Sequence, residues 1–488
     1  MKNLKYIIVL ALLAFLGSCE DATDIIQPGT LDANRAYSNA QDLELGRLGL
    51  YRLLDTSDEI AFTSRFTDET RLGFDNGGQA RALYTFNLNS ESVNPSSMWA
   101  SQYRIIREAT QLINAANTLD VDPADQALVD DVKGQASAIR AFAHFSLLSY
   151  FSTDLTDDDA LGVPAVDFIA GADIQPRRNT NGEVFALIDS DLAVASSSIT
   201  VSDPTFFTID AVNALKARMA AYRGQYNIAG PLAEQLLNAY PLANQANYDL
   251  MFQDVSNDEV IFKLERTVND IYDGQGTGDT GGGTLGSLFA FTGPDLNGSP
   301  YMEMAKELAD LHVAGDIRTT VNLISYPAPA VVNDRDVHIV DKYEGSESRP
   351  LMNDIKVFRS SEMLFILAEA RVDQGLLNGP GSASELIGQL RTARFGAVQT
   401  APNFTSAADA YGQILDERRI ELAFEGHRYK DLKRLGAIGN RTISRDNIDC
   451  AQLGTCSLPI TDYRFTFPIP LSEIIGNPAI AEEQNPGY

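Results

Sequence analysis

The 488-residue sequence predicts a mainly α-helical protein built from packed helix pairs, with only small β pieces. Three observations support this fold class. Apolar residues recur every three to four positions through long segments, which is the spacing of one helix face. Several of these segments form pairs separated by a glycine, whereas strand-like runs are limited to 258–265, 338–344 and 463–469. The predicted helical segments are 39–54, 94–118, 124–152, 180–197, 208–240, 301–313, 357–375, 381–396 and 407–435.

Residues 1–18 are predicted to be a lipoprotein signal peptide. Two lysines precede an apolar stretch at 6–16, which is too short to span a bilayer as a mature helix and leads into small residues. The sequence Leu-Gly-Ser-Cys at 16–19 resembles a bacterial lipobox, which implies cleavage before Cys19 and lipidation of that residue. An ordinary secretory signal that contains a cysteine is the alternative. Several acyl chains on one residue suffice for stable anchoring, so we expect residues 19–488 to form a lipid-anchored mature chain.

The helix pairs have the spacing of tetratricopeptide repeats. In 208–240, Ala214, Ala217 and Ala221 lie on one face of a first helix, and Gly224 ends that helix before a second one begins. Residues 362–396 repeat this arrangement, and 132–152 with 184–199 form a looser pair. Small residues let paired helices approach closely, and stacked pairs build a superhelix.

Two segments, about 55–95 and 245–355, interrupt the helical pattern. Both contain stretches rich in Gly, Asn, Asp, Ser and Thr with isolated aromatic residues. Loops of this kind on a rigid scaffold usually carry the binding residues of a protein. We therefore expect an irregular ligand lobe beside the helical core.

The charge and the cysteines exclude some functions. Sixty-six acidic residues against 38 basic ones give a net charge of −28, which argues against nucleic acid or an anionic membrane surface as a partner. Cys450 and Cys456 are predicted to form a disulfide in an oxidising compartment, and two free thiols are the alternative. Two cysteines without a nearby histidine do not make a zinc site.

The motif search predicts no catalytic residue, no metal site and no cofactor. The four histidines lack the spacing of a zinc enzyme, and no G-x-S-x-G serine motif occurs. Residues 276–281 match G-x-G-x-x-G within a glycine-rich tract, but no strand precedes them, so nucleotide binding is not expected. The carboxylates of Asp154, Asp157, Asp158 and Asp159 could hold Ca²⁺, although a solvated acidic loop explains them better.

The most charged predicted helix covers 414–439. Three pairs of opposite charge stand three residues apart, which is close enough to interact on one helix: Arg418 with Glu421, Glu425 with Arg428, and Asp431 with Arg434. Glu425 and His427 could be read as a catalytic couple. A charge network that ties this helix to its neighbours is the favoured interpretation.

This charged segment, "ERRIELAFEGHRYKDLKRLG", resembles the C-terminal helix of the RagB/SusD family of Bacteroidetes outer-membrane lipoproteins. The ending "FPIPLSEIIGNPAIAEEQNPGY" and, upstream, "MWASQYRIIREATQLINAAN" are also similar to that family and occur in its order. The resemblance implies tetratricopeptide-like helix pairs, a ligand lobe and no catalysis. It also implies capture of oligosaccharides, or alternatively peptides, for a SusC-like TonB-dependent transporter. A glycoside hydrolase is a weaker alternative.

The expected ligand-binding residues are aromatic and polar side chains of the irregular segments. A carbohydrate site presents a flat aromatic face to a sugar ring and polar groups to its hydroxyls. Trp99 belongs to a predicted helix motif, so we expect it in the core. The predicted contacts are Arg71, Phe74, Asp75, Asn76, Tyr84, Asn269, Tyr272, Asp273, Phe289, Phe291 and Tyr301.

Overall fold

The computed structural model describes residues 37–169, 171, 174–267, 285–291, 293, 295–298, 300–326 and 336–488. The signal peptide and Cys19 lie outside the described residues. So do Asn269, Tyr272, Asp273 and the glycine-rich match at 276–281.

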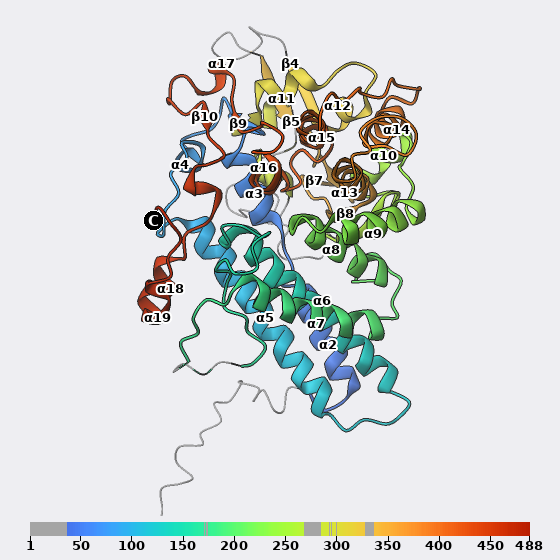
Figure 1. Cartoon of the computed structure of the whole chain (residues 1–488), viewed down its shortest axis with the longest axis vertical. Coiled ribbons are helices and arrows are strands. Elements are labelled where there is room, and N and C mark those ends of the chain that lie inside the picture. Colours follow the sequence, from blue (N-terminus) through green and yellow to red (C-terminus); the bar gives the residue numbers. More distant parts are fainter. Residues whose placement is uncertain are drawn as a thin grey trace, which may run out of the picture.

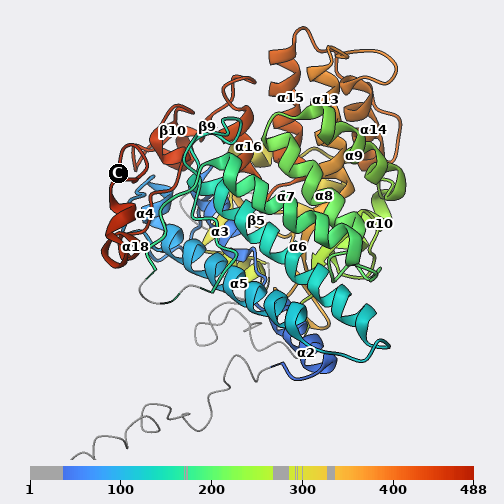
Figure 2. The same ribbon diagram turned by 60° about the horizontal axis from the view of Figure 1, so that its bottom comes forward.

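The first half of the chain folds into long helices that pack side by side. α5 (Val93–Thr118) and α6 (Gln126–Phe151) lie along each other, and α2 (Ala40–Tyr51) and α7 (Asn181–Ser198) pack against α6 (Figures 1 and 2). The Thr180 side chain accepts a hydrogen bond from the Glu183 backbone N–H at the start of α7, and the Glu183 carboxylate accepts one from the Thr180 backbone N–H, which closes a capping box. Trp99 is 4 % exposed and contacts the ring of Phe151, in the predicted core position.

The predicted helix pairs are present. α8 (Ile209–Tyr222) and α9 (Tyr226–Ala239) are joined through Gly224, whose φ of +69° favours glycine. α13 (Ser360–Asp373) packs against both helices, and α14 (Ala383–Phe395) and α15 (Ala407–Glu421) continue the array (Figure 2). The mainly α, tetratricopeptide-like prediction is confirmed.

Small antiparallel strands lie beside the helices. One sheet has the order β1 (Thr70–Leu72), β3 (Met302–Met304), β5 (Val337–Val340), β4 (Leu323–Tyr326). β2 (Val260–Leu264) pairs with β8 (Ile355–Arg359), as the apolar run at 258–265 predicts for a strand. Two two-residue pairs complete the strands: β6 (Gly345–Ser346) with β7 (Arg349–Pro350), and β9 (Ile443–Ser444) with β10 (Ser457–Leu458).

Four predicted elements are wrong in part. The segment 55–95, which is predicted to be irregular, contains the helix α3 (Ser57–Phe66). The helix predicted over 301–313 is instead the strand β3 followed by the helix α11 (Lys306–Leu311). The strand predicted over 463–469 starts as a 3₁₀ turn at Tyr463–Phe465. The helix predicted over 407–435 is two helices, because Phe424 and Gly426 have φ values of +65° and +82°. The second of these, α16, covers Arg428–Leu435.

Short helices complete the fold around these elements. They are α4 (Arg81–Tyr84), α10 (Gln245–Phe252), α12 (Ile317–Asn322), α17 (Asn447–Cys450), α18 (Leu471–Gly476), α19 (Pro478–Ala481) and the 3₁₀ turns Leu285–Leu288 and Leu296–Gly298. The last residues are fixed to the core: the Asn485 amide donates to the carbonyl oxygens of Phe151 and Phe467 at 2.8 and 2.6 Å.

Candidate ligand-binding face

The structure joins the two predicted ligand segments into one surface. β1 from the first segment pairs with β3 from the second, and the Gly73 backbone N–H donates to the Tyr301 carbonyl oxygen at 2.9 Å. The Asn76 side chain donates to the same oxygen at 2.9 Å. A Cβ atom on Gly73 would lie 2.3 Å from the Pro300 carbonyl oxygen, so only glycine permits this close approach.

Accessible aromatic and polar side chains border this junction. Phe74 and Phe291 are partly exposed and Asp75 is exposed. The Phe291 ring contacts the Tyr301 ring with centroids 4.8 Å apart. We call Arg65, Phe74, Asp75 and Phe291 the joined-loop face. It offers ring surfaces, a carboxylate and a guanidinium group, which are the groups that a sugar or a peptide would need.

Arg65 is a member of this face that the sequence reasoning missed. It lies in the last turn of α3 and is partly buried. Its guanidinium group donates to the Leu288 carbonyl oxygen at 2.9 Å and to the Tyr301 hydroxyl at 3.2 Å. The signal that could identify Arg65 is its placement within an apolar helical period, whereas the composition of 55–95 predicts an irregular segment.

Five predicted contacts are buried beneath the face. Arg71, Asn76, Tyr84, Phe289 and Tyr301 are between 0 % and 9 % exposed. They are unavailable to a surface ligand in this conformation, because their polar atoms and rings bind other parts of the chain. Among the predicted contacts that the structure describes, Phe74, Asp75 and Phe291 stay accessible.

Arg71 is buried and stays charged, because two carboxylates pair with it. Its guanidinium group pairs with Glu303 at 2.8 Å and with Asp449 at 3.0 Å. Burial lowers the pKa of Arg71, but these two carboxylates outweigh that effect and raise it. Arg71 therefore anchors the β1 strand rather than reaching into solvent.

A disulfide-closed loop supports the face from the side. Cys450 and Cys456 are joined with an S–S distance of 1.98 Å. Two residues that precede this loop contact the elements beside the face. Asp449 pairs with Arg71, and the Arg445 guanidinium carbon lies 3.9 Å from the Tyr84 ring centroid. The segment 445–456 thus holds both β1 and α4, the two elements that flank Phe74 and Asp75.

The charged residues of α15 and α16 form a buried ion network. Asp431 pairs with Arg434 at 3.1 Å, as predicted, but the other two predicted pairs are wrong. Arg418 pairs instead with Asp431, and Arg428 with Asp68. The interpretation of these charges as a network between neighbouring helices and strands is confirmed.

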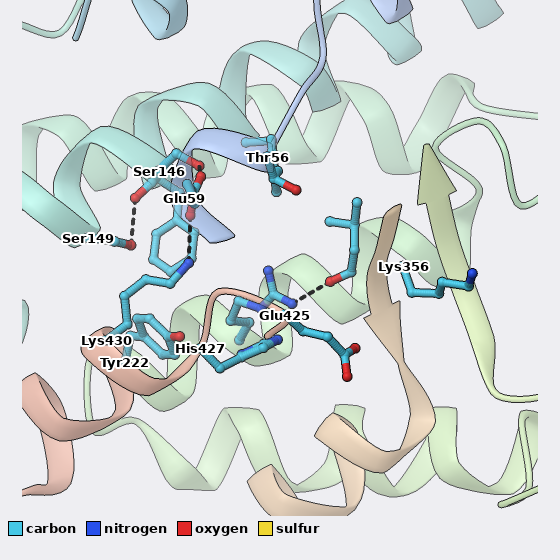
Figure 3. Close-up of a pocket in the computed structure, with 13 residues that line it drawn as sticks. Thr56, Glu59, Ser146, Ser149, Tyr222, Lys356, Glu425, His427 and Lys430 are labelled. Carbon is cyan, nitrogen blue, oxygen red and sulfur yellow. Dashed lines mark hydrogen bonds and ion pairs between the residues drawn. The ribbon is translucent and has the colours of Figure 1, made fainter. Parts of the chain in front are cut away.

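Glu425 and His427 do not form a catalytic couple. Glu425 binds Arg359 at 2.8 Å and Lys342 at 2.6 Å. Both residues line a cavity of about 30 Å³ together with Glu59, Tyr222 and other side chains (Figure 3). A hexose does not fit in this volume, which is about that of one water molecule. Burial holds the pKa of His427 well below its ordinary value, so the imidazole is neutral at pH 7.

The acidic cluster at 154–159 makes local bonds. Asp154 accepts from the Thr156 backbone and Asp157 from that of Asp159, and Asp158 lies 3.2 Å from Arg223. In the part of the chain that the structure covers, no group of three or more acidic, histidine or cysteine residues is arranged to hold a metal ion. None of the described helices is long and apolar enough to cross a membrane.

Comparison with known sequences gives matches over both halves of the chain. Residues 332–488 match a family model described as the SusD family, and residues 54–221 match one described as "Starch-binding associating with outer membrane". Two SusD-like proteins of Formosa agariphila, P38 and P2, are each 25 % identical over the full length of both chains.

Comparison with solved structures gives the same fold. A SusD superfamily protein from Bacteroides vulgatus has a TM-score of 0.77 at 24 % identity, with 93 % of this chain and all of that chain covered. A laminarin-binding SusD-like protein has a TM-score of 0.70 at 22 % identity, covering 93 % of this chain and 100 % of that one. A surface glycan-binding protein A from Bacteroides fluxus also scores 0.70, at 19 % identity, covering 92 % and 100 %.

Proposed function

The chain belongs to the SusD-like family, and from this premise we propose that it is a non-catalytic nutrient-binding lipoprotein of the cell surface. It captures an oligosaccharide and delivers it to a SusC-like TonB-dependent transporter in the outer membrane. Lipidated Cys19 holds it there. The observation that carries the proposal is the joining of two distant loop segments into one face with accessible rings and charges.

The named relatives support a glycan as the ligand. One matching family model is described as starch-binding and associated with the outer membrane, and two structural neighbours are named for laminarin and surface glycans. Aromatic rings such as Phe74 and Phe291 can stack on the C–H face of a pyranose ring, while Asp75 and Arg65 bond its hydroxyls. The absence of a catalytic motif in the sequence supports binding without turnover.

The test is calorimetric titration of residues 20–488 with a panel of neutral oligosaccharides that includes laminari-oligosaccharides. We expect a member of the panel to bind and to be recovered unaltered, as judged by chromatography of the recovered sugar. Phe74→Ala should weaken that binding about 10-fold, because it removes one stacking surface.

Phe168→Ala is the matched control, because Phe168 is 41 % exposed in the connection between α6 and α7. It should bind as the unmodified protein does. Slow release of new reducing ends would assign the chain to the glycoside hydrolases instead. Binding of peptides with no glycan binding would assign it to the peptide-capturing members of the family.

A further inference from the structure

A second hollow lies away from the joined-loop face, where four distant parts of the chain meet. Its volume is about 600 Å³, which is large enough for more than one sugar ring. It is lined by the end of α2, by α5, by the connection before α8 and by the residues after β2. We call it the α2–α5 groove. The side chains that define it are Tyr51, Arg52, Asp55, Arg104, Phe206 and Arg266.

One wall of the groove is aromatic and fixed in place. The rings of Tyr51 and Phe206 meet edge to face with centroids 4.9 Å apart. The Tyr51 hydroxyl donates to Gln135 and accepts from the Phe207 backbone N–H at 2.7 Å, and the Arg47 guanidinium carbon lies 4.5 Å from the Phe206 ring centroid. A wall held by these contacts is preorganised for a flat apolar ligand face, such as that of a pyranose.

The polar rim of the groove carries more positive than negative charge. Arg52, Arg104 and Arg266 face two acidic lining residues, Asp55 and Glu265. Arg266 lies 3.6 Å from Asp55. Among the residues described by the structure, Arg104 has no acidic partner and is exposed on α5. In a chain with a net charge of −28, this surplus of cations is a local exception.

A guanidinium group without an acidic partner favours a negatively charged ligand. Arginine binds a carboxylate or a sulfate through two parallel N–H···O bonds, which are stronger than bonds between neutral groups. The overall negative charge of the chain does not prevent this, because at physiological salt the Debye length is about 8 Å and distant charges are screened.

We propose that the α2–α5 groove is a saccharide subsite that selects a sugar unit with an acidic substituent, either a carboxylate or a sulfate ester. The proposal rests on the proposed function, since it assigns an acidic glycan to the same capture role. The groove and the joined-loop face lie at opposite ends of α3, because Asp55 precedes this helix and Arg65 lies in its last turn. A ten-residue helix is about 15 Å long, a span that an oligosaccharide can bridge.

The experiment compares trigalacturonate with its fully methyl-esterified form, which keeps the sugar scaffold and removes the charge. The unmodified protein should bind the acid at least about 10-fold more tightly than the ester. Arg104→Gln should remove most of that preference while leaving affinity for the ester unchanged, because glutamine suits an exposed helix position and lacks the charge. A sulfated oligosaccharide of equal length tests which acidic group is selected, and binding of either one with dependence on Arg104 supports the proposal.

Arg177→Gln is the matched control, since the Arg177 side chain is 61 % exposed and lies outside the groove. It should keep the full preference for acid over ester. The proposal is overturned if the unmodified protein prefers neither the carboxylated nor the sulfated oligosaccharide over an uncharged counterpart, or if Arg104→Gln leaves that preference unchanged. Binding of neutral oligosaccharides without any acidic one overturns it but leaves the proposed function intact. Failure of both neutral and acidic glycans to bind overturns both.

Discussion

Arg359 shows how a single residue holds the helical core and the strands together. It is 2 % exposed at the end of β8, and its guanidinium group pairs with Glu259 at 3.2 Å, Glu421 at 3.1 Å and Glu425 at 2.8 Å. These carboxylates come from two segments that are far apart in the sequence. Burial lowers the pKa of Arg359, but Glu425 and Glu421 more than reverse this effect, so the group is charged.

We expect Arg359→Ala to destabilise the protein by about 3–5 kcal/mol, because it leaves buried carboxylates without their partner. Urea unfolding followed by circular dichroism measures this change. The control is Arg371→Ala on α13, whose pair with Glu234 is partly exposed, with side-chain exposures of 22 % and 51 %. It should cost less than about 1 kcal/mol. Similar losses in both variants would contradict a special role for the buried network.

Only part of this ion pairing could be predicted from the sequence. Spacing of three residues predicts pairs only within a continuous helix, and the chain leaves the helix between Leu422 and His427. Asp431 and Arg434 remain on one helix and pair, whereas Glu421 and Glu425 bind arginines far away in sequence. The presence of a network could be predicted from charge density. Its partners could not, because the positive φ values at Phe424 and Gly426 depend on tertiary packing.

At the scale of elements, long helices were predictable and short ones were not. The segments predicted at 94–118 and 124–152 differ by at most two residues from α5 and α6. The strand β3 was assigned to a helix because three residues are too few to show a period of two. The accessible part of the joined-loop face was predictable from its loop composition. The burial of Arg71 and Tyr84 was not, because it depends on partners more than 200 residues away.

The disulfide-closed loop is the element that we expect to support the joined-loop face. Replacing both Cys450 and Cys456 by serine should lower stability by about 2 kcal/mol, as the loop-entropy model gives for so small a ring. It should also weaken oligosaccharide binding at the face, because the disulfide positions the preceding residues Asp449 and Arg445, which bind Arg71 of β1 and Tyr84 of α4 on either side of Phe74. Thermal unfolding and calorimetry measure the two effects.

Asp449→Asn separates the two roles of the segment 445–456, since it keeps the disulfide and removes the charge that binds Arg71. It should weaken binding with a smaller loss of stability than the double serine variant. Unchanged affinity in both variants, with a lowered melting temperature, would mean that the loop only stabilises the fold.

At the scale of the whole molecule, acidic side chains dominate the surface, whereas many of the arginines are buried. Among the described residues, a large hydrophobic cluster extends from Ala40 to Ile480, and a smaller one lies around Tyr248 and Phe252. Many of the arginines lie inside the protein in ion pairs, among them Arg318, Arg394 and Arg418. The exterior is therefore strongly negative, which disfavours adsorption to anionic lipid and is compatible with the proposed attachment through an N-terminal lipid.

The sequence after Cys19 predicts where that attachment places the protein. Glu20 and Asp21 directly follow Cys19, the predicted lipidation site, and such an acidic stretch resembles an export signal to the outer leaflet. We expect Cys19→Ala to release soluble protein, because no acyl chain remains. Replacing Glu20 and Asp21 together by alanine should leave the protein lipidated but protected from protease added to intact cells. Fractionation and protease shaving measure these outcomes, with the unmodified protein as the accessible control. Full protease accessibility of the double alanine variant would refute the export role of the two carboxylates while leaving the lipid anchor in place.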